Sequence, residues 1–116
     1  MSWERIFKAL VSLGLSEIDA RVYIHLATKG PALARNIIEE LTVKNSQVYR
    51  SLRHLQDKGT VKTNNEHPTK FSALPFEEVL DMLIELKEEQ AKTLRESREE
   101  LICSWQINKR EKSEDN

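Results

Sequence analysis

Apolar residues near the start of the chain recur with the spacing of an amphipathic helix. They stand at positions i, i+3, i+4, i+7 and i+8: Trp3, Ile6, Phe7, Leu10 and Val11. This stripe predicts a helix that buries one face. Gly14 suits the position just after the end of this helix, because glycine takes a positive φ at little cost.

Two further helices are predicted before residue 42. Ser16 followed by Asp19 resembles a capping box and predicts a helix from there to about Thr28. We expect that helix to bury Ile18, Val22, Tyr23 and Leu26. Gly30-Pro31 ends it, and a short third helix is predicted over residues 33–41.

A fourth helix and a β-hairpin are predicted next. Val48, Leu52 and Leu55 form the apolar ridge of a helix over residues 45–58, which Gly59 closes. The period of apolar positions then changes to two. Residues 60–63 and 70–73 are predicted to be paired strands, joined by a turn at residues 64–69.

A long last helix is predicted from Pro75 to about residue 106, with a polar, flexible tail at residues 107–116. The seam along this helix has spacings of three and four: Val79, Leu83, Leu86, Gln90, Leu94, Ser97, Leu101 and Trp105. Positions 79, 90 and 101 repeat every eleven residues. Such a repeat predicts a nearly straight or slightly right-handed coiled coil.

The long helix predicts a second subunit. A helix of about 30 residues is ~45 Å long, more than a small domain covers, so its distal half needs another surface. We expect that surface to be the same helix of a second copy, in parallel or antiparallel pairing, with Trp3 and Phe7 closing over it. The alternative is that only the proximal half packs and the rest frays.

The order of these elements predicts a mainly α fold with a small β-hairpin. Residues 1–74 would form a winged helix-turn-helix domain, with a recognition helix at 45–58 and a wing at 60–73. Residues 75–106 would form the dimerisation helix. In this architecture the second helix of the pair enters the DNA major groove.

Charge supports that interpretation locally, although the net charge of the chain is −1. Residues 1–73 contain 11 Lys/Arg against 7 Asp/Glu, and residues 74–116 contain 7 against 12. Within residues 42–73 the count is 6 against 2. The basic excess therefore lies on the predicted recognition helix and wing, where salt screening lets it act separately from an acidic segment more than about 10 Å away.

Polar residues on the fourth helix and the wing are the candidate DNA contacts. The base-reading candidates are Lys44, Asn45, Ser46, Gln47, Arg50 and His54, and Ser51 is expected on the same face. The phosphate and wing candidates are Tyr49, Arg53, Lys58, Lys62, His67 and Lys70. The simpler alternatives are a face that is only solvated, a Tyr49 that packs under the wing and a His54 that is an ordinary surface residue.

Other chemistries find little support in the sequence. The three histidines stand on separate predicted elements, and no nucleophile or phosphate-loop motif is present, so we expect no enzyme, no cofactor and no metal. Cys103 excludes an internal disulfide and suits a reduced cytoplasm, with a redox role left open. We find no signal peptide and no apolar run of membrane-spanning length.

Two segments carry a resemblance to a known family. LGLSEIDARVYIHLATKGPALARNIIEEL and SQVYRSLRHLQDKG, extended by EHPTKFSALPFEEVL, resemble the DNA-binding domain of archaeal TrmB-type transcriptional regulators over about residues 10–90. The resemblance implies a winged helix that binds promoter DNA as a dimer. We expect the protein to be cytoplasmic and associated with the nucleoid. The resemblance places the reading positions at residues 44–47 and at Arg50.

The chain also departs from that family pattern. Thr42, Lys44-Asn45 and Leu33 stand where members commonly have Gly, Pro-Arg and a Ser or Thr cap. Typical members carry a sugar-binding domain, for which these 116 residues have no room, so we expect no sugar binding from them. No effector is predicted. The alternative function is a protein-interaction module that uses the acidic long helix.

Overall fold

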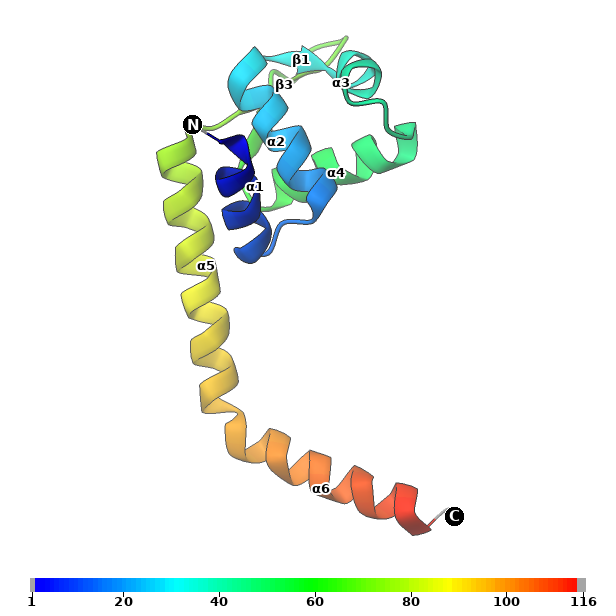
Figure 1. Ribbon diagram of the computed structural model, residues 1–116, viewed down its shortest axis with the longest axis vertical. Helices are drawn as coiled ribbons and strands as arrows, with labels where there is room; N and C mark the ends of the chain where they lie inside the picture. Colours follow the sequence, from blue (N-terminus) through cyan, green and yellow to red (C-terminus); the bar gives the residue numbers. More distant parts are fainter. Residues whose placement is uncertain (1, 115–116) are drawn as a thin grey trace. The chain divides into compact units, whose positions relative to one another are not determined.

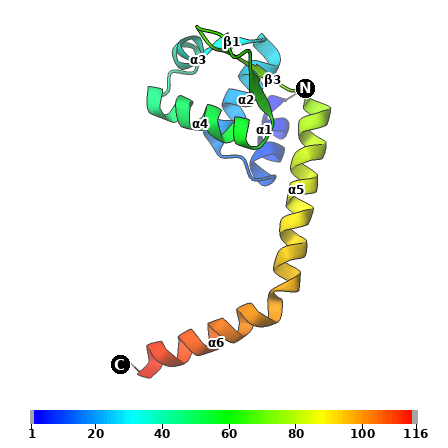
Figure 2. The same ribbon diagram turned by 180° about the vertical axis from the view of Figure 1, so that it is seen from behind.

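The computed structural model describes residues 2–114 and confirms a mainly α chain with a small sheet (Figures 1 and 2). The elements in order are α1 (Trp3–Ser12), α2 (Glu17–Lys29), β1 (Ala32–Leu33), α3 (Ala34–Leu41), α4 (Asn45–Asp57), β2 (Val61–Thr63), β3 (Lys70–Ala73), α5 (Phe76–Glu96) and α6 (Arg98–Glu114). The chain divides into two units between residues 84 and 85.

The start of α2 is held by the capping box that the sequence predicts. The Asp19 backbone N–H donates to Ser16 Oγ at 3.0 Å, and the Ser16 N–H donates to Asp19 Oδ2 at 3.5 Å. These bonds satisfy two of the four N–H groups that lack a partner within the helix at its start. Asp19 is only 3% exposed, so residues that pack against α2 lie close to its carboxylate and can contact it.

The sheet has three strands where the sequence predicts two. Its order is β1-β3-β2, and both pairs are antiparallel. Ala32 of β1 pairs with Phe71 and Leu33 pairs with Lys70, while Val61 of β2 pairs with Ala73. Because β1 leads directly into α3, pairing with β3 fixes the start of α3 beside the wing.

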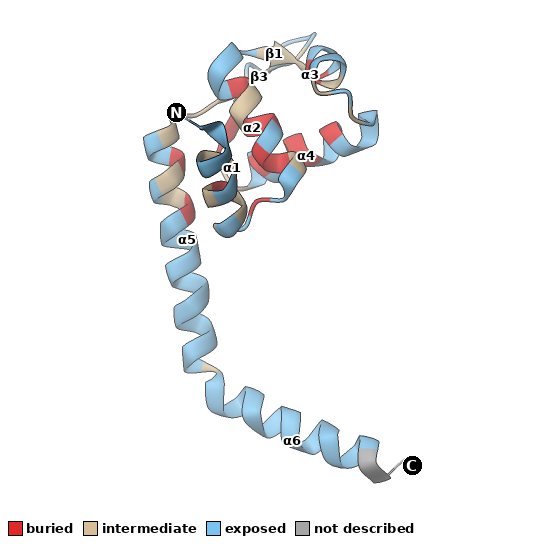
Figure 3. Ribbon diagram, viewed as in Figure 1, coloured by how far each residue is buried: buried red, intermediate tan, exposed pale blue. Residues whose placement is uncertain are grey.

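The core of the first unit lies between α2, α4 and the helices that cover them. Figure 3 shows its buried residues on α2, on the inner face of α4 and on the first turns of α5. The completely or almost completely buried large side chains include Leu10, Val22, Tyr23, Leu26, Ile37, Leu52 and Leu55. Val48, Leu52 and Leu55 thus form the buried ridge that the sequence predicts.

Two residues of the predicted dimer seam belong to this core instead. Val79 and Leu83 are 0% and 1% exposed, and both pack in the hydrophobic cluster of their own chain. The seam prediction is wrong at these two positions, because the first two turns of α5 cover the winged-helix body. The exposed part of the seam begins at Leu86, which is 41% exposed.

The long helix is interrupted at Ser97, which separates α5 from α6. The backbone bonds on either side are kept: the Ser97 N–H donates to the Thr93 carbonyl, and the Leu101 N–H donates to the Ser97 carbonyl. The single long helix that the sequence predicts is thus divided into two at Ser97, and the pairing of its seam stays a prediction. The helix also continues to Glu114, through most of the segment expected to be a polar tail, and residues 115–116 lie outside the described part.

Tyr23 ties α2 to the link between the wing and α5. Its hydroxyl donates to the Leu74 carbonyl at 2.7 Å, and its side chain is 1% exposed. Burial raises the pKa of the Tyr23 phenol to about 12, since the phenolate is poorly solvated there.

This pKa predicts a loss of stability at alkaline pH. The pKa of Tyr23 in the folded chain lies above the ordinary value of 10.0, so its stabilisation is complete below pH 10 and disappears as pH rises towards 12. We expect the free energy of unfolding to fall by roughly 2–3 kcal/mol across that range. Urea titrations at each pH should show a smaller fall for Tyr23→Phe. An equal fall in both proteins would contradict the assignment.

Candidate nucleic-acid interface

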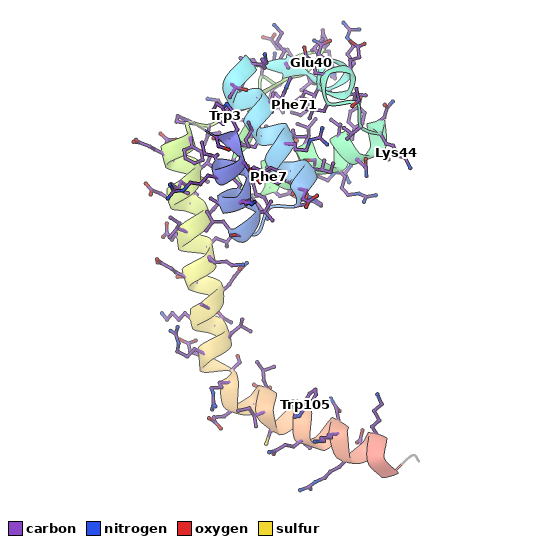
Figure 4. The ribbon with its side chains drawn as sticks, in the orientation of Figure 1. Trp3, Phe7, Glu40, Lys44, Phe71 and Trp105 are labelled. Atoms are coloured by element: carbon purple, nitrogen blue, oxygen red, sulfur yellow. The ribbon has the colours of Figure 1, made fainter. Side chains whose placement is uncertain are left out.

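The N-terminal half of α4 presents a group of exposed polar side chains. Burial of the inner ridge leaves Lys44, Asn45, Ser46, Gln47 and Arg50 exposed. Lys44 is the N-cap residue, provides no side-chain cap and lies at the start of α4 in Figure 4. The free N–H groups and the positive end of the helix dipole therefore add to the positive charge of this surface.

Ser51 of α4 lies on a different face from the one the sequence predicts. Ser51 is 2% exposed, and its hydroxyl has no hydrogen-bond partner within the described part of the chain. It was expected on the exposed face, but its spacing of three from Val48 and four from Leu55 places it on the buried stripe. That spacing was the available signal.

His54 contacts α2 rather than standing free. Its Nδ1 lies 3.6 Å from Oδ2 of the buried Asp19, and the two side chains are 50% and 5% exposed. His54 also follows Asn45 by nine residues, which is about 14 Å along a helix. This position favours a role in joining α2 and α4, and it weakens the prediction that His54 reads a base.

Lys58 is also engaged within the domain. As the C-cap residue of α4 it donates from Nζ to the Gly14 carbonyl at 3.3 Å, and its side chain is only partly exposed. Lys58 therefore lies at the end of α4 opposite to Lys44. This bond and its place at the far end of α4 weaken the prediction that Lys58 contacts a phosphate.

The wing carries its basic residues on exposed positions. Lys62 in β2 and Lys70 in β3 are exposed, as is His67 in the turn. The turn is ordered by its own side chains: Asn64 Oδ1 accepts from the N–H groups of Glu66 and Lys70 at 3.2 and 3.1 Å. The lysines therefore extend from a hairpin whose shape is set before any partner binds.

A hollow of about 320 Å³ lies between α3, α4 and the wing. We call it the α3–wing hollow; its lining includes Leu33, Arg35, Tyr49, Pro68, Thr69 and Phe71. Tyr49 is 53% exposed. Tyr49 lines the hollow together with Pro68 and Phe71, and whether it packs under the wing or contacts a phosphate stays a prediction. Figures 1 and 2 both show the turn of the wing next to α3.

Arg35 is a candidate that the sequence analysis missed. Its neighbourhood depends on β1, whose pairing with β3 brings the first turn of α3 to the wing. A two-residue strand has no detectable period, so no sequence signal placed Arg35 beside Pro68 and Thr69. The basic character of the first turn of α3 was the only hint.

The described residues offer no sign of metal or membrane chemistry. Among residues 2–114 no group of three or more His, Cys, Asp or Glu side chains is arranged to hold a metal ion. The helices in the same range are all too short or too polar to cross a membrane. Cys103 is a free, exposed thiol on α6.

Several solved structures share the fold. TrmBL2, described as an archaeal chromatin protein with a novel mode of DNA binding, matches with a TM-score of 0.73 and 24% identity over 86% of this chain and 39% of that chain. A possible transcriptional regulator from Methanosarcina mazei Go1 matches with a TM-score of 0.59 and 14% identity, over 82% and 87%. A MarR-family regulator from Silicibacter pomeroyi matches with a TM-score of 0.55 and 20% identity, over 84% and 72%.

These likenesses establish the winged-helix fold, and the chain spans well under half the length of TrmBL2. A comparison with curated protein sequences found no match. The model of the family described as "Sugar-specific transcriptional regulator TrmB" matches residues 10–77, which is more than half of the chain and includes α2 to β3. The chain therefore belongs to the TrmB family, a family of transcription regulators and not of enzymes.

Proposed function

We propose that this protein binds double-stranded DNA sequence-specifically as a homodimer and regulates transcription in the nucleoid. The observation that carries the proposal is the split of α4 into two faces. Val48, Leu52 and Leu55 anchor the helix in the core, and the residues from Lys44 to Gln47, with Arg50, remain exposed. A helix held in this way can enter a major groove with its N-terminal half forward.

The exposed residues have the chemistry for both kinds of DNA contact. Asn45 and Gln47 can donate to and accept from adenine, and Arg50 can donate twice to guanine. Arg53, Lys62 and Lys70 are exposed cations suited to phosphates, which fix register without reading sequence. This division of roles predicts different effects for variants of α4 and of the wing.

Exposed apolar residues beyond the first unit support the homodimer. Leu94, Leu101 and Trp105 are 61%, 52% and 69% exposed, and Ile102 and Ile107 are 36% and 55% exposed. Among residues 85–112 every side chain is exposed except that of Ser97, which is intermediate. Large apolar side chains gathered on one segment mark an interaction surface, and a second copy offers the matching one. Within the first unit, Trp3 on α1 is a further exposed apolar residue, at 59% exposure.

DNA binding is testable with fluorescence anisotropy across a salt series. The probes are duplex fragments from the protein's own upstream region and a scrambled duplex of the same composition. Arg50→Ala is expected to reduce discrimination between them by ~1–3 kcal/mol, because a bidentate base contact is lost. Lys62→Ala is expected to lower the affinity for both duplexes alike. It should also reduce the slope of log affinity against log salt concentration by about one.

The control is Lys29→Ala, which removes an exposed lysine from the end of α2. Equal and weak binding by all four proteins would refute the proposal. The alternative of a protein-interaction module would then gain support, because the segment from residue 74 onwards is acidic, with 12 Asp/Glu against 7 Lys/Arg.

A further inference from the structure

We infer that the α3–wing hollow holds a stretch of the DNA sugar-phosphate backbone, with Arg35 as its phosphate ligand and Tyr49 as the wall against the sugar. The inference rests on the proposed function and adds a third contact region beside the recognition helix and the wing lysines. It assigns a DNA contact to Arg35, which belongs to the first helix of the helix-turn-helix pair.

The hollow joins the two surfaces already assigned to DNA. Tyr49 precedes Arg50 on α4, and Pro68 and Thr69 lie in the wing turn between His67 and Lys70. A DNA backbone that contacts both Arg50 and the wing can run along this hollow, because Tyr49 of α4 and Pro68 of the wing both line it. The strand pair β1–β3 holds the start of α3 at its edge, so Arg35 is placed before DNA arrives.

The charges in the hollow suit an anion. Arg35 is the one charged residue among those that line the hollow, and within the described chain its guanidinium takes part in no ion pair or hydrogen bond. Its side chain is exposed, so its donors are free for a phosphate. A guanidinium matches phosphate oxygens with two parallel hydrogen bonds.

Two hydroxyl groups, those of Tyr49 and Thr69, also line the hollow, and only one of them can contribute to phosphate binding. The Thr69 hydroxyl already donates to the Glu66 carbonyl at 2.9 Å, so it cannot also donate to a phosphate. The Tyr49 hydroxyl makes no hydrogen bond within residues 2–114. The remaining lining, from Leu33, Pro68 and Phe71, is apolar and fits the carbon face of a deoxyribose.

The start of α3 adds to the attraction. Leu33 is its N-cap and supplies no side-chain hydrogen bond, so the first N–H groups of α3 lack a side-chain acceptor. The positive end of this helix then faces the same region as Arg35. This contribution supports an anion in the hollow, while the lining and the free guanidinium carry the inference.

The test measures DNA affinity of the full chain for Arg35→Ala, Arg35→Lys and Arg5→Ala. Arg5 is the matched control, an exposed arginine on α1 that does not line the hollow. Arg35→Ala is expected to lose about 10-fold or more in affinity for specific and scrambled duplexes alike. Its salt slope is expected to fall by about one. Arg35→Lys keeps the charge and should keep the salt slope, but it should recover only part of the affinity, because lysine lacks the two parallel donors of a guanidinium.

Single neutral methylphosphonates placed along the duplex then locate the contact. A methylphosphonate at one position should weaken DNA binding by the wild type and leave DNA binding by Arg35→Ala unchanged. The reason is that the methylphosphonate and the Arg35→Ala substitution remove the same ion pair. The inference is overturned if Arg35→Ala binds like Arg5→Ala while Arg50→Ala loses discrimination. If the wild type binds no duplex at all, the proposed function fails, and this inference fails with it.

Discussion

Leu52→Ala is expected to lower the free energy of unfolding by about 2–5 kcal/mol. Leu52 is 1% exposed and stands in the middle of the α4 ridge, in the same buried cluster as Val22 and Leu55. Truncation removes buried methyl and methylene groups and leaves a cavity that close-packed neighbours fill only in part. Since a small domain has roughly 5–15 kcal/mol of stability in all, this loss is a large fraction of it.

Urea denaturation followed by circular dichroism measures this loss. Arg53→Ala is the matched control, because Arg53 is the next residue on the same helix and is exposed; its change should stay within about 0.5 kcal/mol. All proteins must be compared at one concentration, since unfolding of a dimer depends on it. A Leu52→Ala protein as stable as Arg53→Ala would mean that α4 is not anchored by this ridge.

The anchoring of α4 was predictable because it rests on local spacing. Val48, Leu52 and Leu55 recur at helix spacing, and Ser16 with Asp19 marks a helix start by a bond pattern confined to four residues. The sequence predicts that Gly59 closes α4, and its φ of +75° is one that glycine adopts at little cost. Each of these features is determined by neighbours in sequence, so the pattern alone contains the information.

The missed features depend on residues far apart in sequence. The strand β1 forms because Ala32 and Leu33 pair with Phe71 and Lys70. A segment of two apolar residues is too short to show the period of a strand, so its sequence does not predict this pairing. The engagement of His54 with Asp19 and of Lys58 with Gly14 likewise joins segments 35 and 44 residues apart. Helix periodicity shows which face a residue occupies, but it does not show which group stands opposite.

The same distinction explains the corrected seam. Residues 79, 83 and 86 follow one helical stripe, yet the stripe passes from the core of the chain to solvent between Leu83 and Leu86. Periodicity is identical on both sides of this boundary. The boundary is set by how far the winged-helix body extends along α5, a property of the folded domain that the sequence pattern of α5 does not contain.

Trp105→Ala is expected to dissociate the proposed homodimer. Trp105 is 69% exposed on α6 and lies four residues after Leu101, so the two share one face of that helix. A buried tryptophan at an interface typically contributes about 2–4 kcal/mol, and a symmetric dimer loses that amount twice. The dissociation constant should rise by at least about 1,000-fold, which analytical ultracentrifugation measures directly.

DNA provides the second readout and separates loss of the dimer from loss of the fold. Two half-sites about 34–36 Å apart bind a dimer together, so a variant that cannot pair should lose affinity for the two-site duplex and keep its affinity for one half-site. Gln106→Ala, at the neighbouring exposed position of α6, should behave as wild type in both assays. If Trp105→Ala instead sediments as a dimer at the same concentrations as Gln106→Ala, the exposed apolar face of α6 does not pair the subunits. The paired half-sites would then need another explanation, with Trp3 on α1 as the next residue to replace.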